Sequence, residues 1–124
     1  MIVSDSSPII VLGKLGYLEI LKKCFSKIII SSKIYNEIVI KHNTQEAFAL
    51  KKAIEEKWII IEDVKINELL DTVNINRGEK EAISLAQRHK CPLLTDDAPA
   101  KSYALLFNIE IHGTIYVILL ACKN

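Results

Sequence analysis

Residues 78–97 constrain the fold of this chain most strongly, because they read as a helix, a sharp turn and a short buried strand in direct succession. Apolar residues recur at helical spacing between positions 82 and 86, and Pro92 then leads into a two-leucine strand. A helix that runs down one side of a sheet and a strand that runs back up belong to a parallel α/β unit. The glutamates that open this helix and the aspartates that end this strand are therefore expected at the same sheet edge.

The remaining residues repeat this alternation of strands and helices. Short β-branched runs predict buried strands at 1–4 and 28–30, a strand at 58–61 that is at an edge or antiparallel, and a last strand at 109–111. Cap residues and apolar spacing predict helices at 8–12 and 17–23 (separated by Gly13 and Gly16), 31–39, 44–54, 67–73, 99–107 and 114–122. The helices at 31–39 and 44–54 are expected to form a hairpin standing off the sheet. Together these elements predict one domain over residues 1–124, an α/β fold built as a three-layer α/β/α sandwich with a central, mainly parallel sheet.

Composition limits the class of protein. The formal net charge of +1 supplies no broad basic field, so a nucleic-acid partner would need a local patch. Three widely spaced cysteines without a CxxC pair argue against a disulfide framework or a zinc knuckle and favour a reducing compartment. No apolar run approaches the ~20 residues that span a bilayer, and the N-terminus lacks the basic lead of a signal peptide. We therefore expect a soluble cytoplasmic protein with no membrane partner.

Acidic residues follow the predicted strands. In an open parallel sheet the ligand site lies beyond the carboxyl ends of the strands, where Asp5 ends the first strand and Glu79 opens the helix before a later one. By helical phase Glu79 falls inside the apolar stripe, whereas Glu81 is expected to face water with Ser84 and Arg88. Two simpler interpretations remain: Glu79 as a first-turn acid worth about 0.3–1 kcal/mol against the helix dipole, and Asp5 as a plain N-cap.

Three further acids are less clearly placed by the sequence. Asp96 and Asp97 are adjacent, so they cannot point the same way along an extended chain, and we expect one to bind and the other to cap the next helix. The strand pattern does not separate them. Glu37 lies off the apolar face of its helix but within two turns of the end of the second strand, and an ordinary pair with Lys41 is the alternative.

Several carboxylates at one edge imply a particular chemistry. Carboxylates within ~5 Å of one another cannot all stay ionised unless a proton or a metal neutralises them. Oxygen ligands without a His or Cys cluster suit Mg²⁺ or Mn²⁺, which can activate water and clamp a phosphodiester. The three histidines offer no rival chemistry, and the sequence has no P-loop, dinucleotide fingerprint or GxSxG elbow.

Short motifs along nearly the whole chain support this interpretation: VSDSSP at 3–8, IYNEI at 34–38, GEKEAI at 78–83, LTDD at 94–97 followed by Lys101, and GT at 113–114. In this order and spacing they resemble the PIN-domain family, and more closely a prokaryotic PIN subfamily often encoded near antitoxin-like genes. The resemblance implies a PIN fold and a VapC-like toxin, an Mg²⁺- or Mn²⁺-dependent ribonuclease with a cognate antitoxin. It places the catalytic, metal-binding acids on Asp5, Glu37, Glu79 and Asp97. Asp96 stays a further candidate metal ligand because the strand pattern does not separate it from Asp97.

Two departures from the family pattern matter. The third acid, Glu79, is a glutamate where many members carry aspartate, which moves the carboxylate about one methylene further out. Lys101 stands where an arginine is frequent, so a phosphate contact there would be a point charge rather than a fork.

We therefore expect a metal-dependent endoribonuclease, with Ser7, Thr95, Lys101 and Arg77 near the RNA and Lys80 as a further basic candidate. The apolar segment 114–122 predicts either a dimer contact, an antitoxin-covered surface or simple core burial. A non-catalytic nucleic-acid or protein binding module is the main alternative. A receiver-like phosphoacceptor domain would also gather acids at a sheet edge, but it needs paired acids after the first strand, where only Asp5 is found.

Overall fold

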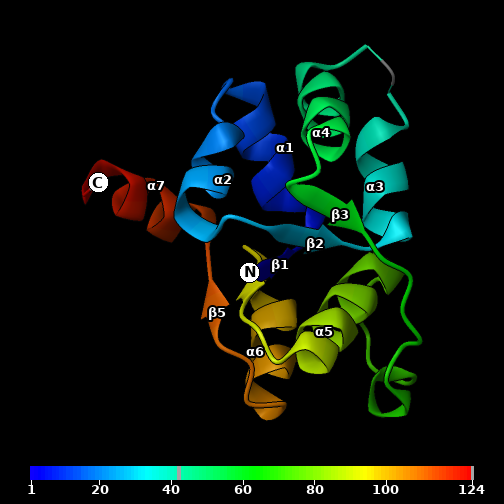
Figure 1. Ribbon diagram of the computed structural model, residues 1–124. Helices are drawn as coiled ribbons and strands as arrows, with labels where there is room; N and C mark the ends of the chain where they lie inside the picture. The colour runs from blue at the N-terminus through cyan, green and yellow to red at the C-terminus, as the bar shows by residue number, and fades with distance from the viewer. Residues whose placement is uncertain (42, 124) are drawn as a thin grey trace.

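A single parallel sheet forms the centre of the molecule in the computed structural model, which describes residues 1–41 and 43–123 (Figure 1). Its five strands run in the order β3-β2-β1-β4-β5, and every neighbouring pair is parallel. The strands are β1 (Ile2–Ser4), β2 (Ile28–Ile30), β3 (Ile59–Ile61), β4 (Leu93–Leu94) and β5 (Ile111–His112). The three-layer α/β/α class is therefore confirmed, and β3 is an edge strand but not antiparallel. The last strand begins two residues later than the predicted 109–111.

Helices cover both faces of the sheet. Figure 1 shows α1, α2 and α4 above the strands and α5 and α6 below them. The helices are α1 (Ser6–Lys14), α2 (Glu19–Phe25), α3 (Ser32–Val39), α4 (Gln45–Glu55), α5 (Arg77–His89), α6 (Ala98–Leu106) and α7 (Thr114–Lys123), with a 3-10 turn η1 (Glu68–Leu70). The prediction that 31–39 and 44–54 stand off the sheet is wrong, because α4 packs against α1 and β3.

Gly13 explains how α1 and α4 come so close. It lies inside α1, and a Cβ atom at this position would be 2.7 Å from Cβ and 2.8 Å from Cα of Glu46. Only a residue without a side chain permits this approach. The chain turns instead at Gly16, whose φ of +77° favours glycine. The prediction that Gly13 interrupts the helix is therefore wrong, and Gly16 alone breaks it.

Helix α5 is more deeply buried than its sequence pattern predicts. Glu81 and Ser84, which were expected to face water, are 8% and 5% exposed. The backbone N–H of Asn67 donates to Ser84 Oγ at 3.0 Å, so the connection before η1 lies over this face of α5. Arg77 covers Glu81 through an Nε to Oε2 contact of 3.0 Å. The connection has no periodicity that would have revealed this in advance.

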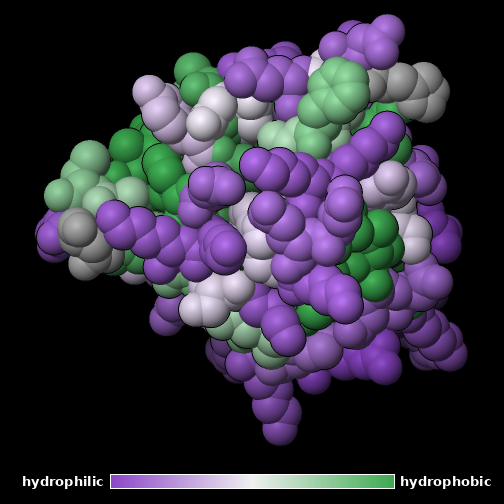
Figure 2. All heavy atoms as spheres, turned by 45° about the horizontal axis from the view of Figure 1, so that its top comes forward, coloured by the Kyte–Doolittle hydropathy of each residue, from purple (hydrophilic) through white to green (hydrophobic). Residues whose placement is uncertain are grey.

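Helix α7 leaves much of its apolar surface open. It packs against α2, and its buried residues are Thr114 and Val117. Ile115 and Leu119 are 74% and 60% exposed, and Figure 2 shows hydrophobic surface gathered on this side of the molecule. Core burial therefore accounts for only part of the apolar character of this helix. Across the residues that the structure describes, no helix is both long and apolar enough to cross a membrane.

Candidate functional site

Asp5 lies at the centre of the acidic edge. The backbone N–H of Asp5 donates to Leu94 O at 2.9 Å, so the ends of β1 and β4 lie side by side. Its side chain is 6% exposed; Oδ1 accepts from Ser6 N–H at 2.8 Å and Oδ2 from Thr95 Oγ1 at 3.0 Å. Burial raises the pKa of Asp5, although both hydrogen bonds act in the opposite direction. Asp5 therefore caps α1 and also lies in the acidic group, so the two interpretations of this residue are compatible.

Thr95 connects two of the acids from within the protein. Its hydroxyl donates to Asp5 Oδ2 and accepts from the backbone N–H of Asp97 at 3.1 Å. Because the side chain is fully buried, it has no surface with which to contact a substrate. Thr95 was expected near the RNA, but it lies inside the protein. Its two hydrogen bonds fix the positions of Asp5 and Asp97 relative to each other.

Glu79 and Asp97 form a coupled carboxyl pair. Glu79 lies in the first turn of α5, is 7% exposed, and has one carboxyl oxygen, Oε2, without a hydrogen-bond partner among the described residues. Burial, followed by the neighbouring Asp97, raises the pKa of Glu79 to about 8. The shared hydrogen bond with Glu79 lowers the pKa of Asp97. The two carboxyl groups therefore titrate as a pair that retains one proton to a higher pH than an isolated glutamate does, with Glu79 as the protonated member.

Glu37 reaches the same edge from α3. Burial raises the pKa of Glu37, and the nearby charge of Asp5 adds to this effect. A Cβ atom on Gly78 would lie 3.0 Å from Glu37 Oε1, so this carboxylate lies against the N-terminal turn of α5. That turn carries the positive end of the helix dipole. Within the described part of the chain Glu37 forms no ion pair with Lys41, which was the simpler explanation of its position.

Asp96 and Asp97 point to different helices. Asp97 is the N-cap of α6 and accepts from Ala100 N–H at 2.9 Å. Asp96 Oδ1 accepts from Thr114 N–H at 2.8 Å, and Asp96 Oδ2 accepts from the hydroxyls of Thr114 at 2.5 Å and Ser7 at 3.2 Å. Both aspartates therefore cap helices, and Asp97 is the one that also meets Glu79.

The predicted basic residues differ in their position relative to the acids. Lys101 and Asp96 both approach Gly113: a Cβ atom there would lie 3.8 Å from Lys101 Nζ and 3.0 Å from Asp96 Oδ1. Arg77 is bound to Glu81, and Lys80 Nζ donates to the backbone oxygen of Asp71 at 3.2 Å. Lys101 is therefore the basic candidate whose position the structure ties to the acidic edge through Asp96.

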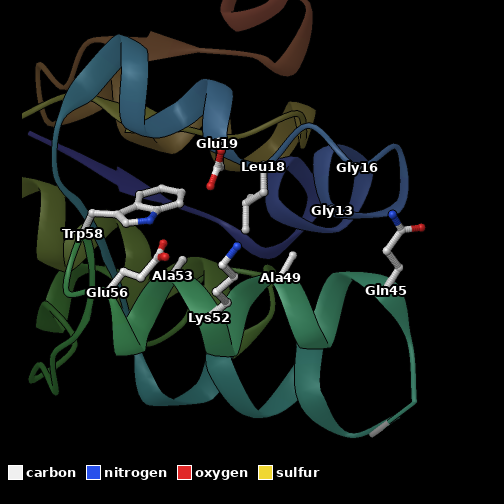
Figure 3. Close-up of a pocket in the computed structure, with 10 residues that line it drawn as sticks. All are labelled: Gly13, Gly16, Leu18, Glu19, Gln45, Ala49, Lys52, Ala53, Glu56 and Trp58. Atoms are coloured by element: carbon white, nitrogen blue, oxygen red, sulfur yellow. The ribbon is translucent and has the colours of Figure 1, made fainter.

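Two cavities differ in their relation to this edge. One of about 360 Å³ opens onto Glu79 and Asp97 and is also lined by Asn74, Asn76 and Pro99. Another of about 180 Å³ lies between α2 and α4, with Trp58 at one end; Glu19 and Glu56 line it, but none of the acids of the sheet edge does (Figure 3). The first cavity is the one that can bring a ligand to the acidic group.

The acidic group fits a divalent cation by its chemistry, although not in its present side-chain conformation. Among residues 1–41 and 43–123 no three His, Cys, Asp or Glu side chains stand close enough to hold a metal ion as they are. The donors are all oxygen, however, and the buried Oε2 of Glu79 lacks any partner in the described residues. A hard cation would supply that partner and neutralise the coupled pair.

These observations define a parallel α/β/α protein with a carboxylate group at the carboxyl edge of its sheet. A family model described as the DUF3368 PIN domain matches residues 1–124, so the chain belongs to the PIN-domain family. PIN domains generally have a nuclease fold and use divalent metal ions.

A solved structure supports the same fold. The chain is similar to a PilT N-terminus domain protein, SSO1118, from the hyperthermophilic archaeon Sulfolobus solfataricus P2, with a TM-score of 0.62 and 13% sequence identity. The similarity covers 100% of this chain and 96% of that one. No curated protein matches the sequence. At this identity the structural likeness shows the fold alone.

The proton on Glu79 predicts a pH-dependent stability in metal-free protein. The folded state keeps this proton between the ordinary pKa of 4.5 and the raised pKa of about 8, so stability is highest below this window and falls as pH rises through it. Glu79→Gln should flatten this decline and raise the free energy of unfolding at pH 8 by about 1–3 kcal/mol. Urea unfolding in EDTA at pH 5 and pH 8 measures both effects, with the exposed Glu56→Gln as control. Parallel pH profiles for wild type and Glu79→Gln would contradict the raised pKa.

Proposed function

We propose that this protein is a metal-dependent endoribonuclease and acts as the toxin of a toxin-antitoxin pair. The observation that supports this proposal most directly is the coupled Glu79–Asp97 pair, with its unpartnered buried oxygen, at the strand ends of a PIN-domain sheet. A buried carboxyl group beside a second carboxyl group, as at Glu79 and Asp97, is costly to maintain. It is the arrangement expected where a cation is bound and released.

Asp5, Glu37, Glu79 and Asp97 are the residues that would hold Mg²⁺ or Mn²⁺. A bound ion of this kind would polarise a phosphodiester and lower the pKa of a bound water. The protein contributes the positions of the carboxylates: Thr95 orients Asp5, and the cap of α6 orients Asp97. Ionisation of Glu79 on metal binding would release the proton that the pair holds at neutral pH.

RNA is the proposed substrate. A metal ion held by the acids would act on a phosphodiester, and the open cavity at Glu79 and Asp97 gives a nucleic-acid strand access to them. Asn74 and Asn76 line the cavity at Glu79 and offer amide groups to a nucleotide. Lys101, and the exposed Arg77 two residues before Glu79 in the chain, can offset phosphate charge. Ser7 lies at the same edge, with its hydroxyl on Asp96. Because the net charge of the chain is only +1, the attraction for RNA would come from these few residues and not from a broad basic surface.

The open apolar face of α7 supports the protein partners that we propose. Ile115 and Leu119 lie four residues apart on one face of α7, and this apolar face is exposed to solvent in the single chain. A second copy of the chain or an antitoxin would cover such a surface. We propose a homodimer that an antitoxin inhibits.

A cleavage assay tests the proposed activity. Purified protein should cleave pooled cellular RNA in the presence of Mn²⁺ or Mg²⁺, and EDTA should abolish cleavage. Asp97→Asn should lower the rate by about 100-fold or more, because it removes the negative charge that would bind the metal ion while asparagine can still cap α6. Glu56→Gln, at an exposed position outside the acidic edge, serves as control. Equal cleavage by wild type and Asp97→Asn would contradict the proposal, and so would wild-type protein that cleaves nothing, the result expected of a non-catalytic binding module.

Gly78 provides a second test, because stability and activity should change in opposite directions. Alanine in this helical position gains about 1 kcal/mol of helix propensity. Its methyl group, however, would meet Glu37 Oε1 at 3.0 Å and push the carboxylate away. We expect Gly78→Ala to keep or raise the melting temperature and to lower cleavage about 10-fold. An unchanged cleavage rate would show that Glu37 has no part in the site.

A further inference from the structure

Asp96 is bonded to two helices at once. Its carboxylate accepts three hydrogen bonds, from the N–H and hydroxyl of Thr114 in α7 and from the hydroxyl of Ser7 in α1. Both of its oxygens are therefore already used by donors of the protein. Three of the roughly four acceptor positions of this carboxylate are filled, and it would lose some of these bonds by turning toward a metal ion.

The contact with α7 is built into the local structure. Gly113 precedes α7 and has no side chain to cap it, so Asp96 supplies the cap from the end of β4. A Cβ atom on Gly113 would lie 3.0 Å from Asp96 Oδ1. Glycine at this position is what lets the carboxylate approach the helix end.

We propose that Asp96 is a positioning residue: it holds α7 and α1 against the end of β4, and so sets the placement of Asp97 and Asp5 without binding the metal. This inference rests on the function proposed above. Asp96 stands between Thr95 and Asp97 in the chain, and Thr95 bonds to both Asp5 and Asp97. Ser7 lies two residues beyond Asp5. The Asp96 carboxylate thus fixes the backbone next to Asp97, after β4, and next to Asp5, after β1.

The alternation of side chains along extended backbone explains this division of roles. Consecutive residues point to opposite sides, so Asp97 meets Glu79 while Asp96 meets Thr114. A displacement of catalytic groups by ~1 Å can lower a rate by about 100-fold. Loosening the Asp96 contacts should therefore reduce turnover even though Asp96 touches neither RNA nor metal.

Thr114 separates a positioning role from a ligand role. Its side chain is 6% exposed, and its hydroxyl bonds to Asp96. Removing this hydroxyl can reach the acidic site only through Asp96. If Asp96 were a metal ligand, loss of the Thr114 hydroxyl would lower Mn²⁺ affinity, whereas a positioning role predicts a lower kcat with Mn²⁺ affinity unchanged.

The experiment is a double-mutant cycle on kcat and KM for Mn²⁺-dependent RNA cleavage at 25 °C, with Mn²⁺ binding measured by calorimetry. The variants are Asp96→Ala, Thr114→Val and the double variant, with Thr114→Ser as the conservative replacement. Lys123→Ala, at an exposed position in the last turn of α7 that has no role in the proposed site or partner surface, is the control. We expect Asp96→Ala to lower kcat by about 10–100-fold and Thr114→Val by about 3–10-fold, with unchanged Mn²⁺ stoichiometry. The double variant should be no slower than Asp96→Ala, because the two residues act through one contact, and Thr114→Ser should restore the wild-type kcat.

Two results would overturn the positioning role. If Asp96→Ala loses Mn²⁺ binding as Asp97→Asn does, Asp96 is a ligand, whatever the kcat of Thr114→Val. If all variants keep wild-type kcat and only melt at lower temperature, the contact merely stabilises the fold. Wild-type protein that neither binds Mn²⁺ nor cleaves RNA would overturn the proposed function, and the positioning role with it. With an active wild type the outcome bears on Asp96 alone.

Discussion

The pairing of β1 with β4 is the contact on which the acidic site depends. Ser4 lies beside Leu94 in this parallel pair, and the next residue, Asp5, donates its N–H to Leu94 O. Residues far apart in sequence, Asp5 and Thr95, are thereby brought within hydrogen-bond distance at the point where both strands end. Because β1 is the central strand, helices from both layers open at this edge and add Glu37 and Glu79.

Burial, with a smaller contribution from neighbouring negative charge, sets the state of Asp5, Glu37 and Glu79. Burial raises the pKa of Asp5, Glu37 and Glu79, so the acidic edge holds charge at a cost to folding. The structure lowers this cost locally with caps, with the Thr95 hydroxyl and with a proton shared by Glu79 and Asp97. A divalent cation would do the same for the whole group. In this account the proton and the metal compete for the same pair of carboxylates.

Local patterns in the sequence predict much of this arrangement. Strand and helix alternation predicts the parallel sheet, and helical phase identifies Glu79 as the inward acid, which its burial bears out. The choice of Asp97 over Asp96, by contrast, came from family resemblance, because both aspartates follow the same strand. What separates them is a tertiary contact between Asp96 and Thr114, which no local pattern contains. The burial of Glu81 and Ser84 escaped prediction for a similar reason, since an irregular connection covers Ser84 and an arginine side chain covers Glu81.

Proton release on metal binding tests the central claim most directly. Titration of Mn²⁺ into metal-free protein at pH 7, by calorimetry in buffers of different ionisation enthalpy, counts the protons that binding displaces. We predict saturable binding with release of about one proton per protein, which falls toward zero in Glu79→Gln. Saturable binding with no proton release, or the same release from Glu79→Gln, would contradict a proton held on Glu79. No binding at millimolar Mn²⁺ would contradict the metal site itself.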